Sequence, residues 1–172
     1  GELNISVNVF GYPFKKPILR NGANLGDSIF VTGQLGKAKQ GLNDWLNKKD
    51  SIYCKDFLRP KPQFQKAKDI SDFATSCIDI SDGLIKDLGD ICKQSNVGAE
   101  LCYEDIPILN DHKDLTHGDD YELCFTAPSH LDDQIKSQGF FLIGKIIQKL
   151  GLLVKKDGCK ITFEKNGWDP FE

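Results

Sequence analysis

The 172-residue sequence has no methionine, which is unusual for a chain of this length. We therefore expect either that it is part of a longer protein or that some residues are missing from it. No apolar run approaches the length of a membrane span, and no secretory signal opens the chain. The formal net charge is -3 and basic residues do not cluster. These absences argue against membranes and nucleic acids as partners.

Two further motif classes are missing. The sequence lacks the glycine-rich GxGxxG and GxxxxGK[ST] nucleotide motifs, and none of its six cysteines forms a CxxC pair. Four of the cysteines, at positions 77, 92, 102 and 124, have apolar neighbours. Small buried side chains in a reducing compartment explain this pattern better than zinc ligands or disulfides do. The expected location is the cytoplasm.

Hydrophobic periodicity predicts alternating helices and strands. Strand patterns occur at 28–32, 76–80, 98–103, 121–127, 140–147, 151–156 and 159–163. Helical spacing follows Gly36, where Ala38, Leu42, Trp45 and Leu46 share one face, and returns at 64–75, from Leu84 onward and after Pro128. The two prolines of 57–63 predict an extended connector. The fold class expected is α/β (α+β), with helices packed on a mixed sheet.

The first residues form a separate pattern. Leu3, Ile5, Val7 and Val9 alternate with polar residues, which predicts a half-buried strand. A strand needs a hydrogen-bonded neighbour, and no element precedes this one in the sequence. The opening segment therefore resembles a strand at the edge of a larger structure.

The acidic stretch "CIDISDGLIKDLGD", residues 77–90, allows three interpretations. A calcium-binding loop is rejected because its turn glycine would stand one place early, with Leu84 in the required position. In the second, Ser81 and Asp82 only cap the following helix. In the third, Asp79 and Asp82 face a magnesium ion while the helix start faces phosphate oxygens. Chemistry alone leaves the second and third interpretations equal.

A second acidic cluster favours a functional site. The stretch "THGDDYELCF" places Asp119 and Asp120 in a loop directly before an apolar strand. A loop of this kind is anchored at one edge of a sheet, where binding residues are common.

These motifs together resemble a known family. "IDISDGLIKDLGDI" followed by "GDDYELCF" is similar to the thiamine-monophosphate kinases, which share a superfamily with aminoimidazole ribonucleotide synthetase and selenophosphate synthetase. "LRNGANLGDSIFVTGQLG", "FLRPKPQ" and "NGWDPF" resemble further segments of these kinases in the same order. The link "PILNDHKDLTHGDD" is shorter than is usual in the family.

The resemblance implies ATP-dependent phosphorylation of thiamine monophosphate to thiamine diphosphate, by direct in-line transfer with Mg2+. It implies that residues 1–12 are the last strand of a largely absent N-terminal ATP- and magnesium-binding domain, and that 13–172 form a layered C-terminal α/β domain. It also implies a homodimer formed through the missing domain. Alone, this half should lack activity.

The family pattern also assigns roles to six residues and implies no catalytic group beyond them. ATP would be bound by Arg20 and Ser81, magnesium by Asp79 and Asp82, and the substrate by Asp119 and Trp168. Two alternatives remain open: another ATP-using enzyme of the superfamily, and a non-catalytic isolated domain.

Overall fold

The structure is a computed structural model that describes residues 3–13 and 15–168. Seven strands form one sheet in the order β2-β4-β1-β5-β3-β6-β7. The strands are β1 Ser28–Val31, β2 Ser76–Asp79, β3 Gly98–Cys102, β4 Leu123–Ala127, β5 Phe141–Ile147, β6 Gly151–Lys156 and β7 Cys159–Ile161. Only β3 and β6 pair in parallel, so the sheet is mixed, as predicted.

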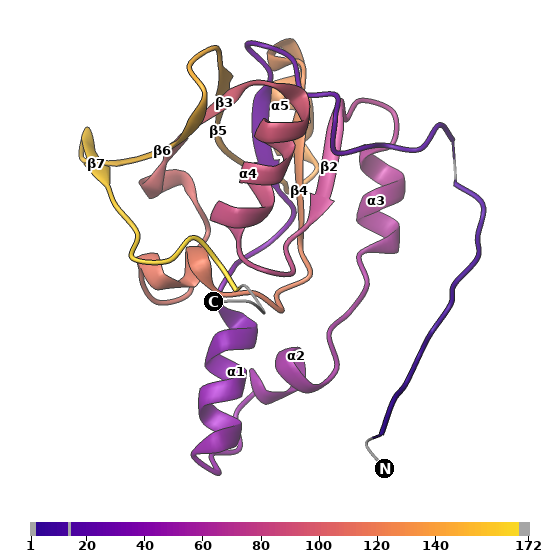
Figure 1. The fold of residues 1–172 in the computed structure, drawn as a ribbon, viewed down its shortest axis with the longest axis vertical. Coiled ribbons are helices and arrows are strands. Elements are labelled where there is room, and N and C mark those ends of the chain that lie inside the picture. The colour runs from indigo at the N-terminus through magenta and orange to yellow at the C-terminus, as the bar shows by residue number, and fades with distance from the viewer. Residues whose placement is uncertain (1–2, 14, 169–172) are drawn as a thin grey trace.

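The α-helices of the described residues are α1 Lys37–Leu46, α2 Cys54–Leu58, α3 Phe64–Ile70, α4 Leu84–Ser95 and α5 Asp132–Ser137. Short 3-10 turns lie at Tyr103–Asp105, His112–Thr116 and Ser129–Leu131. In Figure 1, α4 lies over the sheet, whereas α1 and α2 lie beyond one end of the strands.

Side chains alternate between the two faces of a strand, and in the central strands both faces pack into a core. In β1, Ile29 and Val31 join the core beneath α4, while Phe30 points into the core on the opposite face. The α4 side of the larger core is supplied by Leu84, Ile85, Leu88, Ile91 and Cys92. Phe30 and Phe125 stack with ring centroids 5.2 Å apart in the smaller core, which also includes Ile70 of α3 and Ile135 of α5.

The predicted strands 28–32 and 76–80 and the later strands are confirmed within one or two residues at most ends. The helical face predicted for α1 is wrong, because Trp45 and Leu46 are 52% and 63% exposed. This helix packs against α2 beyond the strands, so of the predicted face only Ala38 is buried, and the other buried positions are Gly41 and Asp44. The short helix α2 was not predicted.

Residues 3–13 differ from their prediction. They belong to no strand, and Figure 1 shows them running alone away from the sheet, with Leu3, Ile5, Val7 and Val9 exposed. The strand prediction at 3–9 therefore fails in this chain because no neighbouring strand completes its hydrogen bonds. Residues 1–2 and 169–172, the ends of the two predicted domain ranges, lie outside the described residues. Within the described residues, no helix combines the length and apolar character needed to span a bilayer.

Candidate functional site

The two acidic motifs are joined by backbone hydrogen bonds. β2 and β4 pair antiparallel, and the ladder continues beyond Asp79. The N–H of Ile80 donates to the carbonyl of Glu122 at 2.7 Å, and the N–H of Tyr121 donates back to Ile80 at 2.9 Å. The N–H of Asp119 reaches the carbonyl of Ser81 at 3.0 Å. The loop that carries Asp119 therefore lies directly beside the loop that carries Ser81 and Asp82.

This close approach depends on Gly118. A Cβ atom at that position would lie 1.9 Å from the carbonyl oxygen of Ser81, so a side chain cannot be accommodated without moving backbone. The loop is also held in an uncommon conformation, with φ of 68° at Asp119 and 50° at Tyr121. Positive φ costs energy in non-glycine residues and often marks functional loops.

The loop before α4 is held by a side chain from inside the helix. Gly83 is the N-cap residue, with φ of 120° and no side-chain cap bond. The Oδ2 atom of Asp87 accepts hydrogen bonds from the N–H groups of Ser81, Asp82 and Gly83 at 3.0, 3.0 and 3.1 Å. The interpretation of Ser81 and Asp82 as helix caps is therefore wrong.

The hydrogen bonds to Asp87 bear on the hypothesis that the start of α4 faces phosphate oxygens. The N–H groups that precede α4 are occupied by a carboxylate, so they are not available to phosphate oxygens. Burial raises the pKa of Asp87 to about 6, with the nearby charge of Asp82 adding to the rise and the N–H bonds opposing it. Any contact of Ser81 with phosphate would have to come from its hydroxyl group.

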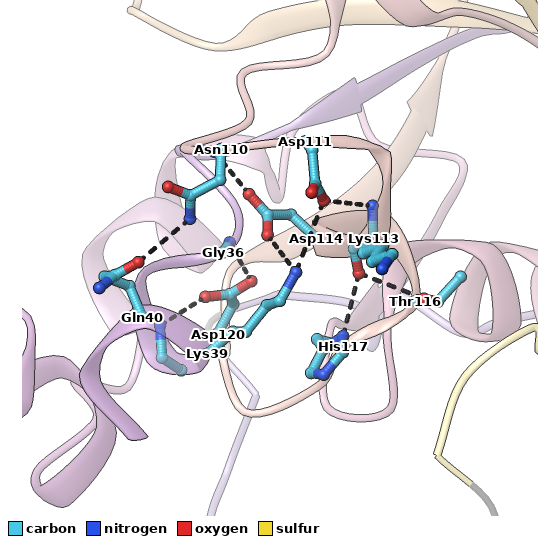
Figure 2. A network of polar contacts seen from close by, with 11 residues as sticks. Gly36, Lys39, Gln40, Asn110, Asp111, Lys113, Asp114, Thr116, His117 and Asp120 are labelled. Atoms are coloured by element: carbon cyan, nitrogen blue, oxygen red, sulfur yellow. Dashed lines mark hydrogen bonds and ion pairs between the residues drawn. The ribbon is translucent and has the colours of Figure 1, made fainter. Parts of the chain in front are cut away.

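Asp120 has a comparable role at the start of α1. Its Oδ2 atom accepts from the N–H of Gly36 at 2.7 Å, and its Oδ1 atom accepts from Ala38 at 3.1 Å. Figure 2 shows this carboxylate beside a second one, Asp114, which is fully buried and binds the ammonium group of Lys39 at 2.9 Å. Both carboxylates hold the segment 110–120 against α1.

The outward carboxylates are Asp79, Asp82 and Asp119, and Tyr121 is their common neighbour. The Tyr121 hydroxyl donates to Oδ1 of Asp119 at 3.5 Å. Burial raises the pKa of this phenol, followed by the charge of Asp119. The charges of Asp79 and Asp82 raise the pKa of Tyr121 further. Tyr121 was not predicted as a site residue, because its place in a strand pattern suggested only packing.

The remaining predicted residues border this region. Arg20 is exposed and lines a cavity of about 540 Å³ together with Asp79, with Ile18, Ile70 and Leu123 among its apolar walls. Trp168 lies on the other side, where its backbone N–H donates to the carbonyl of Asp82 at 3.0 Å. The structure thus brings Ser81, Asp82, Asp119 and Trp168 together, and connects Arg20 to them through Asp79.

A second, polar cavity of about 380 Å³ opens on the other side of Asp119. It is lined by Asp120 and Glu122 and by Lys61 and Lys66. Lys66 binds Glu122 at 2.8 Å, and Glu122 accepts from the hydroxyl of Thr32 at 2.6 Å. These charged side chains were not predicted; the proximity of the "FLRPKPQ" connector to "GDDYEL" appears only in the fold.

The residues present fit a magnesium ion in part. The described residues contain no group of three or more His, Cys, Asp or Glu side chains arranged to hold a metal. Asp79 and Asp82 are both partly exposed, and magnesium commonly takes one or two carboxylates with phosphate oxygens and water. The pair suits a shared ion better than a closed protein cage.

The contact at Gly118 predicts a loss of stability. Replacement of Gly118 by Ala should lower the free energy of unfolding by about 1–3 kcal/mol, because the loop must move away from Ser81. Gly89→Ala is the matched control: a Cβ atom there meets nothing within 4 Å, so the change should be neutral or stabilising by up to about 1 kcal/mol. Urea unfolding gives the free energy of unfolding of both variants. Equal changes at Gly118 and Gly89 would contradict the close approach of Gly118 to the Ser81 carbonyl.

Asp120 predicts a pH dependence. Burial raises its pKa in the folded chain from 3.8 to about 6, so the folded state holds the proton more tightly than the unfolded state. Its contribution to stability is full below about pH 4 and is lost as the pH rises through about 6. Asn at this position cannot titrate. Urea unfolding should therefore show that the free energy of unfolding of the parent chain, relative to that of Asp120→Asn, falls between pH 4 and 6. If the free energies of the two chains change with pH in parallel, the raised pKa is excluded.

Comparison with known proteins supports the resemblance. No protein-family model matches the chain. It is 36% identical over 197 residues to the thiamine-monophosphate kinase of Escherichia coli (strain K12), covering 99% of this chain and 61% of the relative. The aligned span exceeds the 172 residues of this chain, so the relative contains residues with no counterpart here.

Solved structures show the same likeness to thiamine-monophosphate kinases. The thiamine-monophosphate kinase from Stenotrophomonas maltophilia K279a matches with a TM-score of 0.70 and 33% identity, covering 82% of this chain and 53% of that one. AaThiL complexed with AMPPCP and TMP matches with a TM-score of 0.76 and 32% identity, covering 90% and 54%. The chain is thus similar in sequence and fold, over almost its whole length, to thiamine-monophosphate kinases, and it spans about three fifths of the length of the curated relatives it matches.

Proposed function

We propose that this chain supplies the C-terminal half of an enzyme that phosphorylates thiamine monophosphate to thiamine diphosphate with ATP. The observation that carries the proposal is the likeness to AaThiL complexed with AMPPCP, an ATP analogue, and TMP, at 32% identity over 90% of the chain. In this proposal residues 13–172 are the C-terminal domain. Residues 1–12 are the last strand of a preceding domain. That domain would cover the exposed apolar side chains of this strand, and it would also form a homodimer. The enzyme would act in the cytoplasm.

The chemistry follows from charge. Donor and acceptor are both phosphates, so they repel each other, and phosphoryl transfer requires mainly alignment and neutralisation from the protein. Asp79 and Asp82 would hold Mg2+, which when bound neutralises phosphate oxygens. Arg20 would contact the ATP phosphates through its forked donors, across the cavity that it shares with Asp79. The Ser81 hydroxyl would donate to the same phosphates.

The acceptor would lie on the other side of the carboxylates. Asp119 and Trp168 flank Asp82: Asp119 is hydrogen-bonded to Ser81, and Trp168 to Asp82 itself. The thiazolium ring of thiamine is a cation, so it suits a carboxylate and an exposed indole face. Tyr121 would orient Asp119 through its hydroxyl group.

A non-catalytic role for the chain by itself is the second candidate. This chain supplies only two of the proposed metal ligands, Asp79 and Asp82, and it spans 61% of its relative. Two metal-ligand carboxylates and one arginine could hold little positive charge against two polyanions, so activity should require the residues of a preceding domain.

Removal of either proposed metal carboxylate should abolish most activity. In the complete gene product, Asp79→Asn or Asp82→Asn should lower kcat by about 100-fold or more, because charge neutralisation is lost where the transition state needs it. Asp90→Asn removes a carboxylate of α4, the helix that follows Asp82, from outside the proposed site and should leave kcat unchanged. Chromatographic assay of thiamine diphosphate measures all three, and near-normal turnover by the first two would refute the metal assignment.

Trp168 should control the affinity for the acceptor. Loss of ring stacking or cation–π contact by Trp168→Ala should raise KM for thiamine monophosphate about tenfold, with little change for ATP. Trp168→Phe keeps an aromatic face and should recover most of the loss. If Trp168 only packs the chain end, the alanine variant should instead melt earlier, with both Michaelis constants unchanged.

A further inference from the structure

Lys86, in the first turn of α4, contacts both sides of the candidate site. Its ammonium group lies 2.8 Å from Oδ2 of Asp82 and donates to the carbonyl oxygen of Trp168 at 2.6 Å. An ammonium group has three N–H donors, so it can hold both acceptors at once. Lys86 therefore links the proposed metal carboxylate to the residue proposed to face the substrate.

The segment that carries Trp168 also lies directly on the stem of Lys86. A Cβ atom at Gly167 would stand 2.7 Å from Cβ of Lys86 and 2.7 Å from the carbonyl oxygen of Asp82. The N–H of Trp168 donates to that same carbonyl at 3.0 Å. The backbone of Gly167 and Trp168 is thus held between the loop at Asp82 and the lysine.

Burial does not fix Trp168. The residue is 61% exposed, and residues 162–168 belong to no helix or strand. An exposed segment without secondary structure is usually mobile unless polar contacts hold it. The contacts described for its backbone are one N–H bond and one carbonyl bond, and Lys86 makes the second.

We propose that Lys86 is a positioning residue that holds the indole of Trp168 at the edge of the acidic site. The ion pair with Asp82 fixes the ammonium group, and the ammonium group fixes the carbonyl of Trp168. A partly exposed ion pair alone contributes little to stability, so its effect lies in geometry. The role in substrate binding rests on the proposed function, whereas the tether itself does not.

The first test follows Trp168 by fluorescence in this chain. Trp45→Phe makes Trp168 the sole indole. Lys86→Met in this background keeps the aliphatic stem beneath Gly167 but removes the donors. It should raise the acrylamide quenching constant of Trp168 about twofold, because the released segment becomes more accessible. Lys86→Arg, which keeps charge and donors, should restore most of the parent value.

Lys93→Met is the matched control, since Lys93 lies in the last turn of the same helix. It should leave quenching unchanged, and melting curves of all variants should coincide. A quenching constant for Lys86→Met equal to that of the parent overturns the proposal.

The second test is kinetic and uses the complete gene product. Lys86→Met should raise KM for thiamine monophosphate about fivefold, while kcat and KM for ATP stay within about twofold. Altered quenching with unchanged Michaelis constants would support the tether but overturn the assignment of Trp168 to the substrate. The two results therefore separate failure of this inference from failure of the proposed function.

Discussion

The site depends on one feature, the backbone pairing that continues from β2 and β4 past the end of the regular strands. Hydrogen bonds join Ile80 to Glu122 and Tyr121, and Ser81 to Asp119. Without this pairing, two acidic loops 37 or more residues apart in the sequence would have no reason to meet. The glycine at 118 permits the contact because the Ser81 carbonyl occupies the space that a side chain would need.

The pairing also sorts the carboxylates into two kinds. Asp87 and Asp120 turn inward and accept backbone N–H groups at the starts of α4 and α1. Burial raises the pKa of each to about 6, so these carboxylates support the loops at an electrostatic cost. Asp79, Asp82 and Asp119 remain partly or fully accessible, and these are the carboxylates proposed to bind a ligand. The acidic stretch 77–90 therefore contains both a carboxylate that supports the loop, Asp87, and the candidate ligands Asp79 and Asp82.

Much of the fold could be predicted because local pattern determines it. Short apolar runs at 28–32 and 121–127 gave strands, and the spacing from Leu84 gave α4. The start of α4 could not be predicted, since its N-cap is Gly83, without a side-chain cap bond, and Asp87 reaches back from within the helix to hold the backbone of Ser81 and Asp82. Tyr121 and Lys86 were missed for a related reason. The spacing of Lys86 from Asp82 and of Tyr121 from Asp119 is local, but the contact of Lys86 with Trp168 joins residues 82 apart, and no local pattern records it.

The central claim is that Asp79 and Asp82 form one half of a divalent-cation site between two phosphates. The most direct measurement is anomalous diffraction from crystals of the complete gene product grown with Mn2+, a non-hydrolysable ATP analogue and thiamine monophosphate. The account predicts a manganese peak in direct contact with the carboxylates of Asp79 and Asp82, beside Tyr121, with phosphate oxygens completing its coordination. Manganese bound only by residues outside this chain, with no contact to Asp79 or Asp82, would contradict it.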